Sequence, residues 1–430
     1  MKRFKKLLVT LIAFIMVFTF IPVNSSAESS NNGWVGAWST SPVNIDLQSL
    51  GGILDVSLPL NCITFRTRIQ PTISGDKIKL TLSNKYGTKP LTINSMTVAK
   101  GSSSNTRTIK CSTKKYVTYN NKKTIVIPAG KTIQTDPIDL KVTAFEYITT
   151  SMYIKDLNKV KTMGLIGGDT YTKSLNRVNS STFLGGIHLK LSGDFGDYTV
   201  IPVLTGLQVY NKNAKSIVFI GDSTIANNVP LLLAKKLSNS GKNNISVLQQ
   251  AIKGNRLLYD GAGSLGNLYG DATIDRFVED AVNQPGVKYI IVKVGVNDIV
   301  HPNCKSLQGL APKVTTEQMI AGYKKLIKQA HKAGKKIYFC TRTPWKGYTR
   351  NILGRGDDIQ WSEELDEMRI ELNKWVMSKN GSDGYIDLSS LNDETDPYKL
   401  KDEYTTDGAH LTKAGQQALV DAINIKKLFK

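Results

Sequence analysis

Residues 216–224 read Ser-Ile-Val-Phe-Ile-Gly-Asp-Ser-Thr, and this stretch decides how the C-terminal half is interpreted. The apolar run that ends at Ile220 is typical of a strand buried on both faces of a sheet. Gly221-Asp222-Ser223-Thr224 then leads into a helical segment that runs to Leu237. A serine at a strand-to-helix turn has an exposed hydroxyl beside the backbone donors of a helix N-terminus. Gly-Asp-Ser alone is weak evidence, because chance gives a chosen tripeptide in roughly one in twenty chains of this length.

Further buried strands are expected downstream, at residues 245–248, 289–294, 336–340 and 385–388. Helical segments separate them, and the clearest runs from Ser362 to Ser378, with Ser362 as N-cap. Strands that alternate with helices predict an α/β domain with a parallel sheet covered on both faces, over residues 214–430. Binding and catalytic sites in such sheets lie beyond the carboxyl ends of the strands.

The N-terminal part, residues 34–210, has a different periodicity. Short runs alternate between apolar and polar residues, and turn residues such as Ser74-Gly75-Asp76 separate them. This pattern predicts an all-β sandwich domain. The expected strands are residues 64–69, 77–82, 91–98, 124–127, 147–154 and 188–191.

Three more polar segments are expected near the ends of strands. They are Lys253-Gly254-Asn255-Arg256, Gly295-Val296-Asn297-Asp298 and, near the C-terminus, Asp407-Gly408-Ala409-His410. Histidine is the usual base for a serine hydroxyl at neutral pH, and a carboxylate hydrogen-bonded to its ring fixes the tautomer. Glycine permits a close approach of backbone N–H, and an asparagine amide offers two donors. These residues predict a nucleophilic site with an oxyanion hole.

Taken together, the four blocks resemble the SGNH (GDSL) hydrolase family, whose named residues are Ser, Gly, Asn and His. The resemblance places these at Ser223, Gly254, Asn297 and His410, and it places the family's carboxylate at Asp407. It implies catalytic roles for Ser223, Asp407 and His410. It also implies an oxyanion hole of Ser223, Gly254 and Asn297, a flavodoxin-like three-layer α/β fold, and no metal or cofactor.

The N-terminal part adds to this resemblance. Residues 34–38 (Trp-Val-Gly-Ala-Trp) and 82–87 (Leu-Ser-Asn-Lys-Tyr-Gly) are similar to the β-domain, jelly-roll-like, that precedes the catalytic domain in some secreted bacterial members. Two positions depart from the pattern. Thr224 replaces leucine or isoleucine, as in rhamnogalacturonan acetylesterases, and Ala251 stands where glycine is frequent. Both leave the subfamily and the substrate open.

Residues 1–27 read as a secretory signal peptide: a basic start, an apolar run from Leu7 to Ile21, and small residues before Ala27. The apolar run is shorter than the ~20 residues of a membrane-spanning helix, which is the alternative. We therefore expect secretion without membrane insertion. The formal net charge of +21 favours anionic polysaccharide or cell wall, although it also serves solubility alone. No nucleic-acid-binding motif accompanies it.

Four cysteines permit three disulfide pairings. Cys62–Cys111 and Cys304–Cys340 are preferred, because each pair stays within one predicted domain. No cysteine spacing is typical of a zinc site.

Several single residues have two interpretations. His301 is a rival base, since Asp298-Ile299-Val300-His301 repeats the Asp-x-x-His spacing, but Asp298 adjoins Asn297 and is better explained as a structural group. Asp222 is expected to stabilise its turn through backbone N–H groups. Trp345 is either a sugar-stacking platform or a packed loop aromatic.

The sequence therefore predicts a secreted serine esterase that acts through an acyl-enzyme, with an acylated polysaccharide as substrate and deacetylation as its reaction. Two alternatives stay open. One is an extracellular O-acetyltransferase with the same triad, and the other is a non-enzymatic glycan-binding protein. Acyl chain length, the role of the β-domain and the oligomeric state are not determined by the sequence.

Overall fold

The computed structural model describes residues 32–45, 61–102, 107–191, 198–226, 228–348 and 359–429. The predicted signal peptide, residues 1–27, lies outside these ranges. Within the ranges, no helix combines the length and the apolar character that crossing a bilayer requires. Residues 31–430 form one compact unit, and the predicted domain boundaries at 210 and 214 stay predictions.

Antiparallel sheets make up the N-terminal region, as the alternating pattern predicts. A four-stranded sheet has the order β1-β17-β4-β9, and a six-stranded sheet has the order β13-β12-β3-β10-β6-β7. Smaller sheets join β16-β11-β2, β14-β15 and β5-β8. The strands are β1 (Trp34–Ser39), β2 (Pro42–Asn44), β3 (Asn61–Ile69), β4 (Ile78–Ser83), β5 (Leu91–Ile93), β6 (Ser95–Lys100), β7 (Lys115–Tyr116), β8 (Ile125–Ile127), β9 (Thr132–Gln134), β10 (Ile148–Asp156), β11 (Thr162–Gly164), β12 (Gly168–Ser174), β13 (Ile187–His188), β14 (Lys190–Leu191), β15 (Tyr198–Thr199), β16 (Ile201–Pro202) and β17 (Leu204–Tyr210). Their arrangement as a jelly roll stays a prediction.

The C-terminal region contains a five-stranded parallel sheet in the order β19-β18-β20-β21-β22. Each of the five predicted strands is present, and the order is that of flavodoxin-like folds. The strands are β18 (Lys215–Gly221), β19 (Ile245–Ala251), β20 (Val287–Lys293), β21 (Lys336–Cys340) and β22 (Gly384–Ile386). The helices are α2 (Val229–Asn239), α3 (Gly266–Tyr269), α4 (Thr273–Phe277), α5 (Val296–Val300), α6 (Thr316–Lys332), α7 (Glu363–Met377), α8 (Lys413–Ala422) and α9 (Ile425–Leu428).

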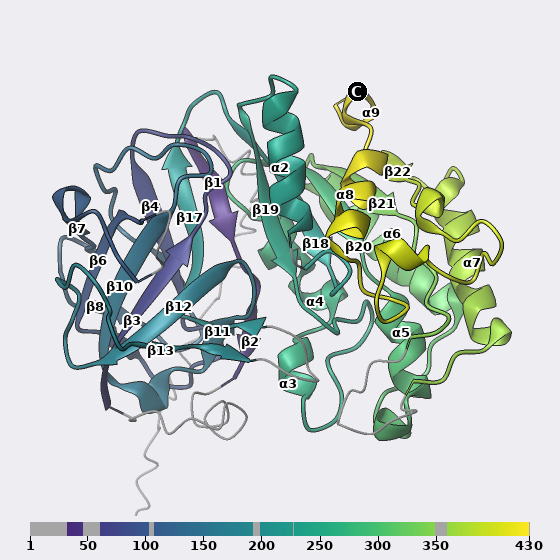
Figure 1. The fold of residues 1–430 in the computed structure, drawn as a ribbon, viewed down its shortest axis with the longest axis horizontal. Helices are drawn as coiled ribbons and strands as arrows, with labels where there is room; N and C mark the ends of the chain where they lie inside the picture. Colours follow the sequence, from purple (N-terminus) through teal and green to yellow (C-terminus); the bar gives the residue numbers. More distant parts are fainter. Residues whose placement is uncertain are drawn as a thin grey trace, which may run out of the picture. The chain divides into compact units, whose positions relative to one another are not determined.

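Helices cover both faces of this sheet. Phe219 of β18 packs in one cluster with Leu233 of α2, whereas its neighbour Ile220 packs in another with Leu326 of α6. Successive strand residues point to opposite faces, so the two clusters mark the two sides of a three-layer α/β fold (Figure 1). Ser362 caps α7, as expected, by accepting a hydrogen bond from the backbone N–H of Leu365.

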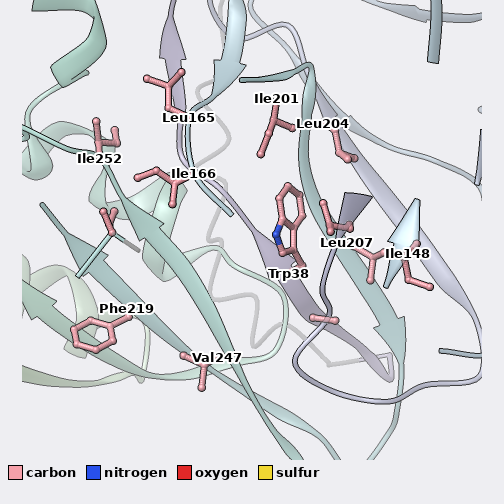
Figure 2. Close-up of a cluster of buried hydrophobic side chains, with 14 of the residues drawn as sticks. Trp38, Ile148, Leu165, Ile166, Ile201, Leu204, Leu207, Phe219, Val247 and Ile252 are labelled. Carbon is pink, nitrogen blue, oxygen red and sulfur yellow. The ribbon is translucent and has the colours of Figure 1, made fainter. Parts of the chain in front are cut away.

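One of these clusters continues into the antiparallel sheets. Figure 2 shows Trp38 and Leu207 of the N-terminal region in the same apolar cluster as Phe219 and Val247 of the parallel sheet. Strand β1 lies beside β19, and a Cβ atom on Gly36 would lie 2.7 Å from Leu248 Cδ1. The glycine between Trp34 and Trp38 therefore lets β1 approach the sheet closely.

Three predictions about local structure were wrong. The expected strand 188–191 is divided between β13, which ends at His188 and pairs with β12, and β14, which begins at Lys190 and pairs with β15. The expected strand 91–98 is split, because Asn94 accepts from Lys155 N–H and donates its own N–H to Tyr153, leaving β5 and β6 on either side. Neither predicted cysteine pair forms a disulfide.

The positions of the cysteines explain why. Cys304 and Cys340 pack in the clusters on opposite faces of the parallel sheet. Cys62 lies on β3, and Cys111 lies beside β6, with β10 between the two strands. Two strand spacings amount to about 9.5 Å, more than the ~7 Å limit between the Cα atoms of a disulfide.

Candidate active site

The turn after β18 holds Ser223 at the carboxyl end of the sheet. Asp222 is buried, and its Oδ1 accepts the backbone N–H of Thr224 at 3.0 Å and the Thr224 hydroxyl at 2.6 Å. This is the turn-stabilising role expected for Asp222. A Cβ atom on Gly221 would lie 1.9 Å from the carbonyl oxygen of Lys293, so only glycine lets the strand end this close to β20.

Thr224 has a polar function that leucine or isoleucine cannot supply. The Nζ atom of Lys293, at the end of β20, donates to Thr224 Oγ1 at 2.7 Å. Lys293 is 3% exposed, and burial lowers the pKa of Lys293 while the charge of Asp222 opposes that shift. The departure from the family pattern at Thr224 thus links the serine turn to a buried cation, which the sequence did not predict.

The structure brings Ser223, His410 and Asp407 together. His410 Nε2 lies 3.0 Å from Ser223 Oγ, and His410 Nδ1 lies 2.6 Å from Asp407 Oδ2. The second carboxylate oxygen of Asp407 accepts the backbone N–H groups of Ala409 at 3.0 Å and of His410 at 2.8 Å. Burial acts to raise the pKa of Asp407, but the hydrogen bonds from His410 and Ala409 outweigh it and hold the pKa well below its usual range.

A tight turn sets this geometry. Gly408 has φ +88°, and a Cβ atom there would lie 2.5 Å from the backbone carbon of Gly347. Helix α8 begins directly afterwards, with Thr412 as N-cap accepting from Gly415 N–H. When His410 donates from Nδ1 to Asp407, Nε2 is left as an acceptor for the hydroxyl proton of Ser223.

Donors suited to an oxyanion lie in the blocks that contain Gly254 and Asn297. Gly254 has φ +76°, and a Cβ atom there would lie 2.2 Å from Tyr269 Cδ1. Asn297 Nδ2 donates one N–H to the carbonyl oxygen of Asn255 at 3.0 Å, which leaves its second N–H for a ligand. Within the described ranges, the backbone N–H groups of Ser223 and Gly254 have no acceptor in the protein.

His301, the rival base, is not in the cleft. It is 3% exposed and packs at a tilt against Tyr269, with ring centroids 5.1 Å apart. Burial, and then the charge of Arg256, lowers the pKa of His301 to about 3. Asp298 accepts the backbone N–H groups of Leu257 at 2.6 Å and Leu258 at 3.1 Å. Burial raises the pKa of Asp298 to about 6, and its role is structural, as expected.

Ser223, Asp407 and His410 line a cleft of about 760 Å³. Residues of the N-terminal region, among them Trp38 and Arg68, also line this cleft. A second, much smaller pocket of about 20 Å³ adjoins Ser223, His410 and Asn297, and Trp345 and Tyr348 lie in its wall.

Trp345 is 1% exposed. It therefore packs as a loop aromatic, and the alternative of a sugar-stacking surface does not apply. Within the described part of the chain, no three His, Cys, Asp or Glu side chains are grouped so that they could hold a metal ion.

Besides Lys293, sequence reasoning missed two further buried residues beside the site. Asn255 is 0% exposed, and its Nδ2 donates to the carbonyl oxygens of Tyr269 and Asp271, both at 2.8 Å. Arg276 of α4 is 2% exposed, and its Nη2 donates to Asn255 Oδ1 at 2.8 Å and to the carbonyl oxygen of Gly221 at 3.3 Å. The only sign of Asn255 in the sequence was its position directly after Gly254. The only sign of Arg276 was a charged residue beside the apolar residues of a short helix.

The family model "GDSL-like Lipase/Acylhydrolase" matches residues 217–423. A GDSL-like lipase structure from Bacteroides thetaiotaomicron is 13% identical, has a TM-score of 0.34, and the match covers 50% of this chain and 87% of that one. An acetyl xylan esterase structure is 19% identical, with a TM-score of 0.35 and coverage of 48% and 96%.

A variant of an acetyl xylan esterase from Geobacillus stearothermophilus is 16% identical, with a TM-score of 0.36 and coverage of 50% and 94%. Among curated proteins, none matches the chain in sequence. The family match begins within β18 and ends beyond α8, so it includes all four blocks. Residues 217–423 therefore form a domain of the GDSL-like lipase/acylhydrolase family, a family of hydrolases.

Proposed function

We propose that this chain is an extracellular serine esterase that removes acetyl groups from a polysaccharide. The observation that carries the proposal is the continuous chain of contacts from Ser223 Oγ to His410 Nε2, at 3.0 Å, and from His410 Nδ1 to Asp407, at 2.6 Å. A hydroxyl in this setting is activated by the imidazole, and the carboxylate stabilises the imidazolium that forms.

The reaction proceeds in two steps. Ser223 Oγ attacks the ester carbonyl carbon while its proton passes to His410 Nε2, and the backbone N–H groups of Ser223 and Gly254 with the Asn297 amide bind the oxyanion. The C–O bond to the sugar then breaks, and His410 protonates the leaving alkoxide. Water, deprotonated by His410, attacks the acetyl-Ser223 ester, and His410 returns the proton to Ser223 as acetate leaves.

The size of the pocket beside Ser223 supports a short acyl group. Its volume of about 20 Å³ has room for about one water-sized group. Buried Trp345 forms part of its wall. An acetyl methyl group fits this space, and a longer acyl chain would have to displace the wall.

The larger cleft supports a polymeric alcohol partner. Its volume of about 760 Å³ is in the range of sites that enclose several sugar-sized groups. Arg68 and Lys413 lie in its lining, and the net charge of +21 favours a polyanion. The signal peptide that the sequence predicts over residues 1–27 supports action outside the cell.

The test is release of acetate from acetylated pectin, which is acidic, and from acetylated xylan. Wild type should release acetate, and Ser223→Ala should lose the activity by about 10⁴-fold or more. Ser216→Ala is the matched control, because it removes a buried serine hydroxyl at the opposite end of β18. Retained release in Ser223→Ala would contradict the mechanism. Transfer of acetyl to an added sugar without release of acetate would establish the transferase alternative instead.

A further inference from the structure

A buried polar network surrounds Arg276 and reaches the backbone of Gly221 and the side chain of Asn255 beside the active site. Arg276 Nη1 donates to Asp280 Oδ2 and to the carbonyl oxygen of Gln250, both at 2.9 Å. Arg276, Asp280 and Gln250 are each at most 3% exposed. A buried guanidinium held by this many acceptors has little freedom to reorient, because each lost bond leaves a costly unpaired group.

On its inner side, this network holds the backbone that carries the oxyanion donors. Nε and Nη2 of Arg276 both donate to Asn255 Oδ1, at 3.1 and 2.8 Å, and Thr273 Oγ1 donates there at 2.7 Å. Asn255 follows Gly254 directly, and its carbonyl oxygen accepts the Asn297 amide at 3.0 Å. Two of the three expected oxyanion donors therefore depend on where Asn255 lies.

On its outer side, the network ends on the N-terminal region. Ser41, which precedes β2 and is 2% exposed, has its Oγ 2.9 Å from Arg276 Nη1, 2.9 Å from Asp280 Oδ2 and 2.6 Å from Gln250 Oε1. The hydroxyl accepts from Arg276 and has one proton to share between the two oxygens.

A second connection runs through Tyr86. Its hydroxyl donates to Asp271 Oδ2 at 2.8 Å, and the backbone carbonyl of Asp271 accepts from Asn255 Nδ2 at 2.8 Å. Lys85 adds ion pairs to Asp271 at 3.3 Å and Glu279 at 3.1 Å. The segment that contains Lys85 and Tyr86 belongs to the N-terminal region, and through these contacts it holds the loop that contains Asp271 in place.

We propose that Ser41 and Tyr86 are positioning residues of the active site, so that the N-terminal region, through Arg276 and Asn255, holds the oxyanion donors in place. This inference rests on the proposed function. It assigns to the antiparallel sheets a role in the rate of the chemical step. Neither residue lines the cleft or touches the substrate in this account.

The first test is the steady-state kinetics of Ser41→Ala on p-nitrophenyl acetate. A small displacement of the donors lowers transition-state stabilisation, so kcat should fall about tenfold while KM changes by less than about twofold. Ser216→Ala is again the matched control, because Ser216 Oγ donates to the Pro285 carbonyl at 2.8 Å, far from Asn255. Equal kcat values for the two variants would overturn the proposal.

The second test places Ser41→Ala in an Asn297→Ala background. If Ser41 acts through the oxyanion donors, its effect on kcat should shrink to about threefold once Asn297 is removed, because the backbone N–H of Gly254 is then the only donor that Asn255 still positions. A full tenfold loss in both backgrounds would mean that Ser41 acts elsewhere, and it would overturn the proposal. Tyr86→Phe, which removes a single hydroxyl, gives an independent variant if Ser41→Ala folds poorly.

A third measurement needs no turnover and separates this inference from the proposed function. In protein labelled with ¹⁵N-asparagine, the Asn297 side-chain amide signals are assigned by their loss in Asn297→Ala. Ser41→Ala and Tyr86→Phe should shift these signals, and Ser216→Ala should not. Wild type without esterase activity, together with shifted signals, would reject the function but support the connection. Signals that stay in place in active protein would reject the connection alone.

Discussion

The chain contains Asp-x-x-His twice, at residues 298–301 and 407–410. The two segments have the same spacing, but they differ in burial and in the contacts of their histidines. In the first, Asp298 and His301 are at most 3% exposed. In the second, the side chains of Asp407 and His410 are 23% and 24% exposed and line the cleft. The burial of the first pair keeps His301 neutral, whereas the second histidine contacts Ser223.

Backbone conformation explains this difference. Residues 298–300 lie in helix α5, so the Asp298 carboxylate turns to the backbone N–H groups of Leu257 and Leu258. Gly408, at φ +88°, breaks any helix at the second segment and lets Asp407 reach His410 Nδ1. Spacing alone therefore does not identify a catalytic pair. The glycine that follows the aspartate in the second segment, Gly408, is the more informative sign, because it prevents a helical conformation.

The largest expected effect on kcat comes from replacing each of the two histidines separately. His410→Gln should lower kcat by about 10⁴-fold, since no base remains for Ser223. His301→Phe should change kcat by less than about threefold, because the ring keeps its packing against Tyr269 and a buried Nδ1 without a hydrogen bond is removed. Ester hydrolysis by both variants is the measurement, and a loss in His301→Phe as large as that in His410→Gln would remove the distinction.

A smaller effect is expected from Gly408→Ala. The added methyl group meets the backbone of Gly347, and the positive φ is strained for alanine. Displacement of Asp407 relative to His410 should lower kcat by about 10- to 100-fold. Gly381→Ala is the control, because Gly381 has φ +92° with open space around it. Similar kcat values for both variants would show that the turn does not set the geometry of the triad.

The smallest effect concerns the pH dependence of stability. Folding raises the pKa of Asp298 from 3.8 to about 6. As pH falls, Asp298 is therefore protonated in the folded protein before it is protonated in the unfolded chain. The folded state gains stability as pH falls from about 6 to 3.8. Folding lowers the pKa of Asp407 from 3.8. Its contribution is present above that value and is lost only at lower pH.

Urea unfolding of wild type, Asp298→Asn and Asp407→Asn between about pH 7 and about pH 4.5 tests these opposite signs. Wild type should gain stability relative to Asp298→Asn as pH falls, whereas its difference from Asp407→Asn should stay constant. Parallel pH profiles for the two variants would contradict the assigned environments.

The sequence was most informative where a short local pattern determines the structure. The run that ends at Ile220 and Gly221 predicted β18 and its turn, because a short apolar run that ends at a glycine turn is typical of a strand buried on both faces of a sheet. Ser362 predicted the start of α7 for a similar reason. The strand break at Asn94 was not predictable, because it depends on hydrogen bonds to β10, which lies more than fifty residues away in the chain.

The site shows the same limit. Ser223, Gly254, Asn297, Asp407 and His410 were predicted as site residues from local motifs, and their expected position near strand ends follows from the fold class. Arg276 and Lys293 could not be assigned, because a buried cation is recognised only by the acceptors that the fold brings to it. The predicted cysteine pairing was wrong, because the spacing of cysteines along the chain does not show on which face of a sheet, or on which strand, each cysteine lies.

The most direct measurement of the central claim is covalent labelling with a fluorophosphonate, followed by peptide mass spectrometry. The nucleophile attacks phosphorus, fluoride leaves, and the adduct stays on the serine that His410 activates. We expect stoichiometric labelling at Ser223 in wild type and much slower labelling in His410→Gln, with His301→Phe labelled at the wild-type rate. An adduct on another residue, or folded wild type that hydrolyses esters but takes up no label at Ser223, would contradict the account.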